Sequence, residues 1–237
     1  MRLIPVIDIL NGVVVRGIAG QRDQYRPLQS AITDSVDPLR VATAIRERFG
    51  LRELYVADLD AITRESRDFE LYRQLSDRIP HTWIDAGVTH AQVACEVLET
   101  GFERVIIGSE SCTSPACFAE IVQAVPPARL TFSLDLKSGE SLASPQWGKT
   151  PLDVASSAIK SGAKSIIILD LATVGTGAGV STLDLCAQLR QQHGSELEII
   201  TGGGLRNQDD LCRLEDAQVD AVLVASALHA SDSWLNA

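Results

Sequence analysis

The sequence predicts a single (β/α)8 barrel, and three observations support this fold. Its 237 residues fall within the range of about 200–250 residues that such barrels commonly use. Short apolar runs, most of them unbroken as in parallel strands covered on both faces, alternate with segments of helical period. The two halves of the chain also repeat motifs in the same order. We therefore expect one domain over 1–237, with half-barrels at about 1–126 and 127–237, in preference to an open doubly wound sheet.

The apolar runs are the expected barrel strands, and helix signals follow them. The eight runs are 2–8, 53–58, 81–87, 104–109, 130–135, 165–170, 198–203 and 221–226. Asp37-Pro38 and Ser114-Pro115 offer an N-cap residue followed by a proline in the first helical turn. Thr150 and Asp153 resemble a capping box. The expected helix C-termini are followed by glycine, at Gly50, Gly101, Gly162 and Gly194.

An internal repeat relates the ends of four strands in the first half to four in the second. The matched segments are Ile7–Gly12 with Leu134–Gly139, Ala57–Leu59 with Leu169–Leu171, Ala86–Val88 with Gly203–Leu205, and Ile107–Ser109 with Val224–Ser226. Any one match is typical of a strand end followed by a turn, but four in register indicate a duplication. A duplicated barrel places equivalent groups on opposite sides of one mouth, which suits a long substrate with a charged group at each end.

Composition excludes several classes of function. Lys plus Arg number 21 and Asp plus Glu 31, so the formal charge is −10. Nucleic acids and anionic membranes bind basic surfaces, so neither is an expected partner. No apolar run is long enough to cross a membrane or to act as a signal peptide. The five cysteines and four histidines lack the spacing of a disulfide framework or a zinc site. We expect a cytoplasmic protein without a metal or cofactor.

Two aspartates are the best catalytic candidates. Asp8 and Asp135 end the first and fifth expected strands, and the active sites of such barrels lie at the C-terminal ends of the strands. Two carboxyl groups facing one mouth can divide into a base and an acid when their environments separate their pKa values. An aspartate after a strand can also simply cap the next turn. Asp58 and Asp170 end the second and sixth strands, and both interpretations stay open for them.

A phosphate site is expected after the seventh and eighth strands. Gly203 and Gly204 let the backbone approach phosphate oxygens, and Ser226 begins the segment after the eighth strand. The loops after these two strands form the common phosphate site of the fold. Arg16 and Arg206 can add a guanidinium to it. The expected partner is therefore a small phosphorylated metabolite.

The repeat suggests a second, weaker anion site on the opposite side of the mouth. Gly87 and Ser109 are the counterparts of the phosphate residues, but the neighbouring Asp85 repels anions. Trp147 lies in the loop after the fifth strand. An exposed indole there can stack on a flat heterocycle, or it can anchor the loop.

Together these motifs resemble the histidine-biosynthesis barrel family over essentially the whole chain. The resemblance rests on Asp8, on Asp135 within SLDLK, on Trp147 in the following loop, on the GGGL motif after the seventh strand, and on Ser226. The family comprises phosphoribosylformimino-aminoimidazole carboxamide ribotide isomerase and imidazole glycerol phosphate cyclase. SLDLK and Trp147 are more similar to the isomerase. The cyclase needs a glutaminase partner, which we do not expect here.

The resemblance implies an Amadori rearrangement of an aminoaldose to an aminoketose. It makes Asp8 the general base and matches Asp135 to the second family aspartate. It also implies one phosphate at Gly203, Gly204 and Ser226, a second at Gly87 and Ser109, and stacking of Trp147 on the aminoimidazole. Asp170, Gly175 and Thr176 fall in the family motif after the sixth strand.

The chain departs from the family pattern in two places. Val174 stands where the family carries the aspartate assigned as general acid, and 85–89 reads DAGVT in place of GGGIR. The loop with Tyr25-Arg26-Pro27 is more similar to a related subgroup found in methanogens and methylotrophs. The alternative is therefore a divergent paralogue that acts as a lyase, cyclase or synthase on another phosphorylated metabolite, for example in one-carbon cofactor metabolism. A third alternative is a binding or regulatory paralogue without catalysis.

Overall fold

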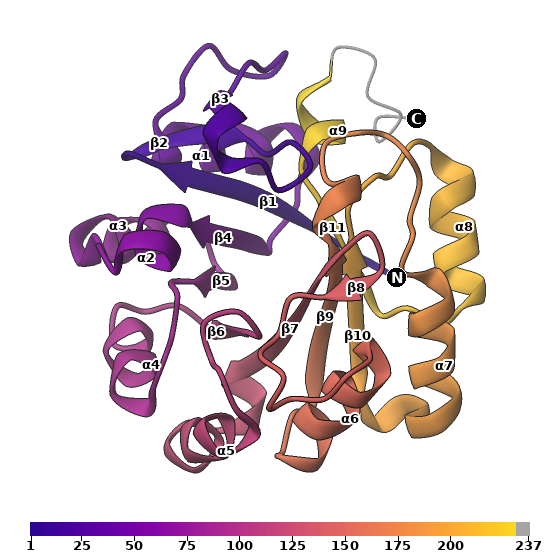
Figure 1. Cartoon of the computed structure of the whole chain (residues 1–237). Helices are drawn as coiled ribbons and strands as arrows, with labels where there is room; N and C mark the ends of the chain where they lie inside the picture. Colours follow the sequence, from indigo (N-terminus) through magenta and orange to yellow (C-terminus); the bar gives the residue numbers. More distant parts are fainter. Residues whose placement is uncertain (231–237) are drawn as a thin grey trace.

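A computed structural model describes residues 1–230 as a closed barrel of parallel strands with helices around the outside (Figure 1). Around the barrel the strands follow the order β1, β4, β5, β6, β7, β9, β10 and β11, and β11 pairs with β1 in parallel to close the ring. Their bounds are Arg2–Leu10, Leu54–Asp58, Thr82–Asp85, Arg104–Gly108, Leu130–Lys137, Ser165–Asp170, Glu198–Gly202 and Ala221–Val224. Each of the eight predicted runs overlaps one of these strands, with β1 and β7 extending two residues further, and this confirms the predicted (β/α)8 fold.

Two small hairpins were absent from the sequence prediction. β1 continues into a tight turn and pairs antiparallel with β2 (Val13–Arg16), and β7 pairs in the same way with β8 (Glu140–Ser141). The turns are Asn11-Gly12, with φ of 52° and 74°, and Ser138-Gly139, with φ of 55° and 82°. Positive φ at both central residues is the geometry of the tight hairpin turn that Asn-Gly favours. A two-residue strand, β3 (Arg26–Pro27), pairs with β2.

The helices begin largely where the capping signals predicted. Asp37 accepts from the Arg40 N–H, Ser114 accepts from the Cys117 N–H, and Thr150 and Asp153 form a reciprocal capping box. The outer helices are α1 (Pro38–Phe49), α3 (Phe69–Arg78), α4 (Ala91–Leu98), α5 (Pro115–Ala124), α6 (Pro151–Lys160), α7 (Leu183–His193) and α8 (Gln208–Asp216).

Shorter helical segments follow several strands. Asp58 ends β4 and caps α2 by accepting from two backbone N–H groups, and it also accepts from the Tyr72 hydroxyl at 2.5 Å. Asp58 is therefore a capping residue. The remaining segments are α2 (Leu59–Arg64), α9 (Ser226–His229), η1 (Arg22–Gln24), η2 (Pro127–Arg129), η3 (Leu171–Thr173) and η4 (Gly194–Glu196).

Apolar packing fills the inside of the barrel, and an ion network lies at the N-terminal end of its strands. Ile4, Trp83, Ile106 and Ile200 belong to the cluster inside the barrel, and a larger cluster fills the space between strands and helices. At the N-terminal end of the strands Arg2 bridges Glu53 and Glu198, and Arg104 also bonds Glu198. The Arg104 guanidinium lies 4.5 Å from the Trp83 ring centroid. The C-terminal ends of the strands are left to form the cavity.

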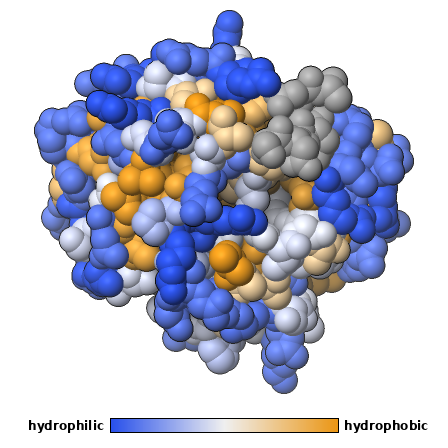
Figure 2. Space-filling view, turned by 90° about the horizontal axis from the view of Figure 1, so that it is seen from above, coloured by the Kyte–Doolittle hydropathy of each residue, from blue (hydrophilic) through white to orange (hydrophobic). Residues whose placement is uncertain are grey.

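The outer surface is largely hydrophilic. Figure 2 shows hydrophilic residues around smaller apolar patches on one face. Met1 is the single exposed large apolar side chain among residues 1–230. None of the helices in this range has the length and apolar composition that crossing a membrane requires.

Candidate active site

A cavity of about 460 Å³ opens at the C-terminal ends of the barrel strands. Strands and loops from both halves of the chain line it. Most of the site residues predicted from the sequence are among its lining: Asp8, Arg16, Asp135, Gly175, Thr176, Gly203, Gly204 and Ser226. Gly87, Ser109, Trp147 and Asp170 are not.

Asp8 lies on β1 with its carboxyl group facing the cavity. A Cβ at Gly17 would stand 2.9 Å from Asp8 Oδ2 and 3.5 Å from the Tyr25 hydroxyl, so glycine leaves room for the carboxyl group. Burial raises the pKa of Asp8 to about 6, while the charge of Arg22 acts in the opposite direction. The same surroundings, burial first and the Asp8 charge second, raise the pKa of Tyr25 to about 12. Asp8 can therefore exchange a proton near neutral pH.

Asp135 lies on β7 and has the higher pKa of the predicted pair. Its Oδ1 accepts from the Ser133 hydroxyl at 3.1 Å, and its backbone N–H donates to Ser109 Oγ at 3.3 Å. Burial raises the pKa of Asp135 to about 7, and the charges of Asp85 and Glu110 add to this effect. Asp135 is therefore the carboxyl group better suited to hold a proton at neutral pH.

Asp85 is a third carboxyl group in the cavity. It ends β5, and its Oδ1 accepts from the Gly87 N–H at 3.0 Å. Burial raises its pKa to about 6, against the lowering effect of the Gly87 N–H. From its position beside Gly87, Asp85 was expected only to repel phosphate. The signal that identified Asp8, an aspartate directly after an apolar strand, also applies to Asp85.

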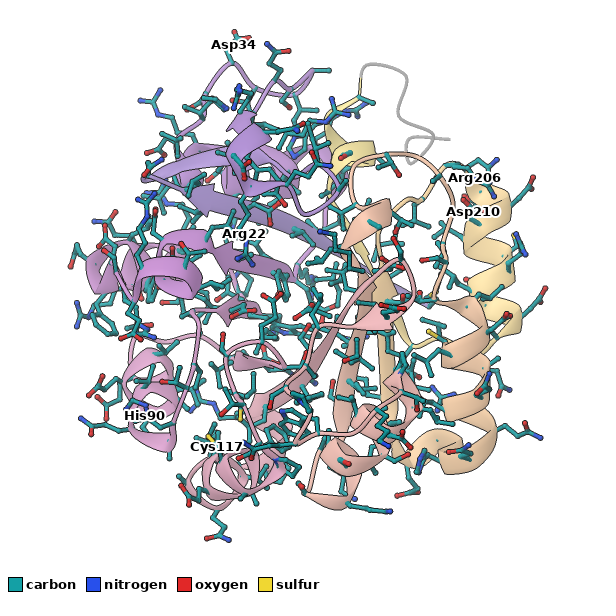
Figure 3. All side chains as sticks on the ribbon, in the orientation of Figure 1. Arg22, Asp34, His90, Cys117, Arg206 and Asp210 are labelled. Carbon is teal, nitrogen blue, oxygen red and sulfur yellow. The ribbon has the colours of Figure 1, made fainter. Side chains whose placement is uncertain are left out.

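An ion pair crosses part of the cavity mouth. Arg22, in η1, contacts Glu110, in the turn after β6, with 3.3 Å between Nη2 and Oε2. Figure 3 shows Arg22 near β1 and β4 in this view. Its positive charge lowers the pKa of Asp8, Asp85 and Asp135. Neither partner of the ion pair was predicted, because the only signal was a charged stretch after the first strand.

The expected phosphate residues meet at the β10 and β11 side of the cavity. Gly203 and Gly204 have φ of 84° and 73°, which is the left-handed region that glycine adopts readily. A Cβ at Gly204 would overlap the Gly179 carbonyl, so the loops after β9 and β10 touch backbone to backbone. Ser226 begins α9 beside them. On this side the cavity is therefore lined by the backbone of Gly203 and Gly204 and by the hydroxyl group of Ser226.

The two predicted arginines differ in their surroundings. Arg16 ends β2, is exposed and lines the cavity. Arg206 also lines the cavity, but its guanidinium donates to both oxygens of Asp210, at 2.9 and 2.6 Å. Figure 3 shows Arg206 and Asp210 together beside α8. Arg16 is thus the more available cation for a ligand.

Gly175 and Thr176 lie in the loop that follows η3, where that loop meets the segment after β2. A Cβ at Gly175 would overlap the Gly17 carbonyl oxygen, and Ala19 N donates to Val174 O at 2.8 Å. Val174 lines the cavity, and its Cγ1 would lie 3.4 Å from a Cβ at Gly17. An apolar side chain therefore stands near the Asp8 carboxyl group where the family resemblance implies an acid.

The expectation of an exposed indole at Trp147 is corrected by the structure. Its side chain is only 1% exposed and lies in the core, with ring centroids 4.8 Å from Phe132 and 6.0 Å from Phe118. Its Nε1–H donates to the Cys112 carbonyl at 2.7 Å. Apolar contact with two aromatic rings and a satisfied N–H explain this position. Trp147 anchors its loop, which was the other interpretation of the sequence.

Three further predicted site residues support the backbone and do not line the cavity. Ser109 is fully buried, and Gly87 packs against α2, where a Cβ would come 2.7 Å from Ile62 Cα. Asp170 is 2% exposed and accepts from the N–H groups of Ser138 and Gly139 at the tip of the second hairpin. Gly87 and Ser109 therefore do not face the cavity, and Asp170 organises loops through its hydrogen bonds to backbone N–H groups.

The fold and cavity place the chain in the class of (β/α)8 barrels with a mouth lined by carboxyl groups. Comparison with known sequences then assigns its family. The profile of the family described as "Histidine biosynthesis protein" matches residues 2–233, and the chain belongs to this family.

Individual relatives include named isomerases. An uncharacterized protein of Methanocaldococcus jannaschii is 31% identical over 97% of this chain and 93% of its own length. The phosphoribosyl-(phosphoribosylamino)methylideneamino imidazole-4-carboxamide isomerase of Thermus thermophilus is 27% identical over 97% and 94%. The isomerase of the same name from Maridesulfovibrio salexigens is 30% identical over 91% and 86%. The similarity thus extends over most of each chain, and it supports an isomerase at the level of the family.

Proposed function

We propose that the protein is an acid–base isomerase that converts a phosphorylated aminoaldose into the corresponding aminoketose. The observation that carries this proposal is the pair of half-buried carboxyl groups, Asp8 and Asp135, which reach one cavity from opposite strands of the ring. Membership in a family with named isomerases supports the reaction type. Proton transfer at a carbon next to an imine requires a base and an acid at neutral pH.

The two carboxyl groups divide the work according to their pKa values. With a pKa of about 6, Asp8 is mostly ionised at pH 7 and serves as the base. Burial and the charges of Asp85 and Glu110 raise the pKa of Asp135 to about 7, so this group holds a proton more readily than Asp8 and serves as the acid. Asp135 donates its proton to the ring oxygen, the ring opens, and C1 is left as an iminium.

The remaining steps return every proton. Asp8 removes the proton from C2, and the C2–H electron pair forms the carbon–carbon double bond of an enaminol while the C1–N double bond becomes single. A proton then enters at C1 from Asp8, in exchange with solvent, and the C2 hydroxyl proton passes to Asp135, which leaves a ketone at C2 and both carboxyl groups in their starting states. The reaction is a net isomerisation, so the proposal needs no oxidant, reductant or cofactor.

The phosphate group is proposed to bind at Gly203, Gly204 and Ser226, with Arg16 at the rim. The absence of Cβ atoms at the two glycines allows close approach to backbone N–H groups. The Ser226 hydroxyl and the exposed guanidinium can donate further hydrogen bonds. Phosphate binding at this position would hold the sugar carbons over the centre of the cavity, between Asp8 and Asp135.

A second candidate function is supported by Val174. Valine has no proton to donate, and Asp85 adds a third carboxyl group to the cavity. A lyase, cyclase or synthase acting on another phosphorylated metabolite would use the same phosphate residues with a different arrangement of acids. The two candidates differ in product, because only the isomerase yields an aminoketose with the composition of its substrate.

Thermal-shift screening followed by turnover tests the proposal. The ligands are inorganic phosphate, sugar phosphates and phosphorylated aminoaldoses, including the aminoaldose bisphosphate of histidine biosynthesis. A ligand at about 100 times its dissociation constant adds roughly 2.7 kcal/mol of stability, which a melting curve resolves. We expect stabilisation by a phosphorylated aminoaldose and formation of the ketose. Stabilisation without ketose formation by any such ligand would favour the second candidate function.

Two variants separate binding from chemistry. Ser226→Asp places a carboxylate in the phosphate site, and the thermal shift caused by phosphorylated ligands should disappear. Asp8→Asn should keep that shift and lose turnover. Asp34→Asn is the matched control, because Asp34 is an exposed aspartate at the edge of the molecule (Figure 3). A thermal shift that survives in Ser226→Asp would contradict the assigned phosphate site.

A further inference from the structure

Tyr55 is a buried tyrosine that lines the cavity from inside the barrel. It lies on β4, and only 7% of its surface is exposed. Its register partners on the two neighbouring strands are Val6 and Trp83, and the Tyr55 ring packs in the apolar cluster within the barrel. The side chain therefore begins in the barrel interior and ends at the cavity.

The next row of inward-facing side chains leaves room for the Tyr55 hydroxyl. Ala57 pairs with Asp8 on one side and with Asp85 on the other, and Figure 1 shows β4 between β1 and β5. Alternate residues of a strand face the same side, so Ala57 follows Tyr55 on the inner face of the barrel. A methyl group fills little of the space between the two carboxyl groups, and side chains in strands lean along the strand. The Tyr55 hydroxyl is thus directed toward the level of the carboxyl groups.

The Tyr55 hydroxyl is open to the cavity, and within residues 1–230 it has no hydrogen-bond partner. The buried Tyr72 differs in this respect, because its hydroxyl donates to Asp58 at 2.5 Å. A buried tyrosine hydroxyl usually finds a partner, since leaving it unbonded costs free energy. The partner that fits the Tyr55 hydroxyl is therefore an oxygen atom of a ligand in the cavity.

The surroundings of Tyr55 keep its hydroxyl protonated. Burial first, and then the charges of Asp85, Asp135 and Asp8, raise the pKa of Tyr55 well above its usual range. An ionised carboxyl group only accepts hydrogen bonds, whereas a protonated phenol donates one. Tyr55 therefore adds an uncharged donor to a group of three carboxyl groups.

We propose that the Tyr55 hydroxyl donates a hydrogen bond to the C2 oxygen of the substrate and so orients the C2–H bond toward Asp8. This inference rests on the proposed function, in which Asp8 removes the C2 proton and Asp135 accepts the C2 hydroxyl proton. The C2 oxygen keeps a lone pair for a donor while its own proton faces Asp135. Tyr55 is thus a substrate-binding residue that selects sugars with a hydroxyl group at C2.

Two sugar phosphates that differ only at C2 test this contact. Ribose 5-phosphate carries the C2 hydroxyl, and 2-deoxyribose 5-phosphate has a hydrogen in its place. Isothermal titration calorimetry at pH 7.5 measures the dissociation constant of each. We expect wild-type protein to bind ribose 5-phosphate roughly three- to tenfold more tightly, because that factor is the usual net contribution of one hydrogen bond.

Two matched variants assign this preference to Tyr55. Tyr55→Phe keeps the ring and removes the hydroxyl, so the preference for ribose 5-phosphate should decrease at least threefold. Its melting temperature should not fall, because the hydroxyl has no partner within residues 1–230. Tyr72→Phe is the control, since Tyr72 does not line the cavity. It should keep the preference and lower the melting temperature, because Asp58 loses its donor.

Turnover measures the same contact during the reaction. With a phosphorylated aminoaldose that wild-type protein converts, Tyr55→Phe should lower kcat/KM at least threefold, because a hydrogen bond to the reacting sugar is lost. Tyr72→Phe should keep the wild-type kcat/KM. A wild-type value in Tyr55→Phe would overturn the proposed contact.

The binding results separate this inference from the proposed function. If wild-type protein binds neither sugar phosphate, the phosphate site and the proposed function fail, and the Tyr55 contact fails with them. If wild-type protein binds both equally, or if wild type and Tyr55→Phe show the same preference, the Tyr55 contact is wrong while the phosphate site stands. A lower melting temperature in Tyr55→Phe with an unchanged preference would make Tyr55 a structural residue.

Discussion

Replacement of Asp135 by asparagine should stabilise the folded protein, and more strongly at high pH than at low pH. Burial and two neighbouring carboxylates raise the pKa of Asp135 from 3.8 to about 7. Between these values the folded state binds more protons than the unfolded state, so the stability of the wild-type protein falls as the pH rises through about 7. Asparagine has no charge to bury, and its Oδ1 can still accept from Ser133. The variant therefore lacks the loss of stability that ionisation of Asp135 causes as the pH rises.

The expected stabilisation by Asp135→Asn follows from the pKa of Asp135. Each tenfold change in proton affinity is worth about 1.4 kcal/mol. Integrated over pH, the advantage of Asp135→Asn should grow by about 2–3 kcal/mol between pH 5 and pH 8. For a domain of this length, that corresponds to roughly 5–10 °C in melting temperature. Asp8 and Asp85 keep their own raised pKa values in the variant, so part of the pH dependence of the wild-type protein remains.

Thermal unfolding at pH 5, 6, 7 and 8 measures this difference. Wild type and Asp135→Asn are compared with Asp34→Asn, whose substitution lies at the exposed edge of the molecule (Figure 3). The difference between Asp135→Asn and wild type should increase with pH, and the difference for Asp34→Asn should stay constant. Parallel curves for Asp135→Asn and wild type across this range would refute the raised pKa and the assignment of Asp135 as an acid at neutral pH.

Three further predictions test the site and its support. Trp147→Ala should lower the free energy of unfolding in urea by about 3–5 kcal/mol, because it leaves a cavity in the core and the Cys112 carbonyl without its donor. A decrease below about 1 kcal/mol would contradict the anchoring role of Trp147. Gly204→Ala should remove phosphate-dependent thermal shifts, since its Cβ would overlap the Gly179 carbonyl and its φ is positive. An unchanged shift would contradict the assignment of this loop to the phosphate site. Asp8→Asn should lower turnover by roughly 10²–10⁴-fold, and turnover at the wild-type rate would exclude Asp8 as the base.

The strands and the central carboxyl groups were predictable because their signals are local. A run such as Ser165–Asp170 is continuously apolar, and burial on both faces of a parallel strand requires that pattern. Asp8 and Asp135 each follow such a run directly, and the repeat related them. Strand ends in a barrel meet at one mouth, so their proximity followed from the fold.

The remaining features depend on contacts between distant parts of the chain. Arg22 and Glu110 are 88 residues apart in loops without regular pattern. The position of Trp147 is decided by Phe118 and Phe132, from α5 and β7. The repeat placed Ser109 at a strand end but could not tell whether its side chain faces the cavity or the core. Side-chain direction at a strand end depends on packing that the sequence pattern does not encode.

The most direct test of the central claim is proton exchange during turnover of a phosphorylated aminoaldose in deuterated water, followed by proton NMR. Wild-type protein should form the aminoketose with solvent deuterium at C1, because Asp8 removes the C2 proton and a proton is delivered to C1. Asp8→Asn should bind the same ligand and leave the C2 proton in place. Binding without loss of the C2 proton in the wild-type protein, or equal loss in both proteins, would contradict an isomerase that uses Asp8 as its base.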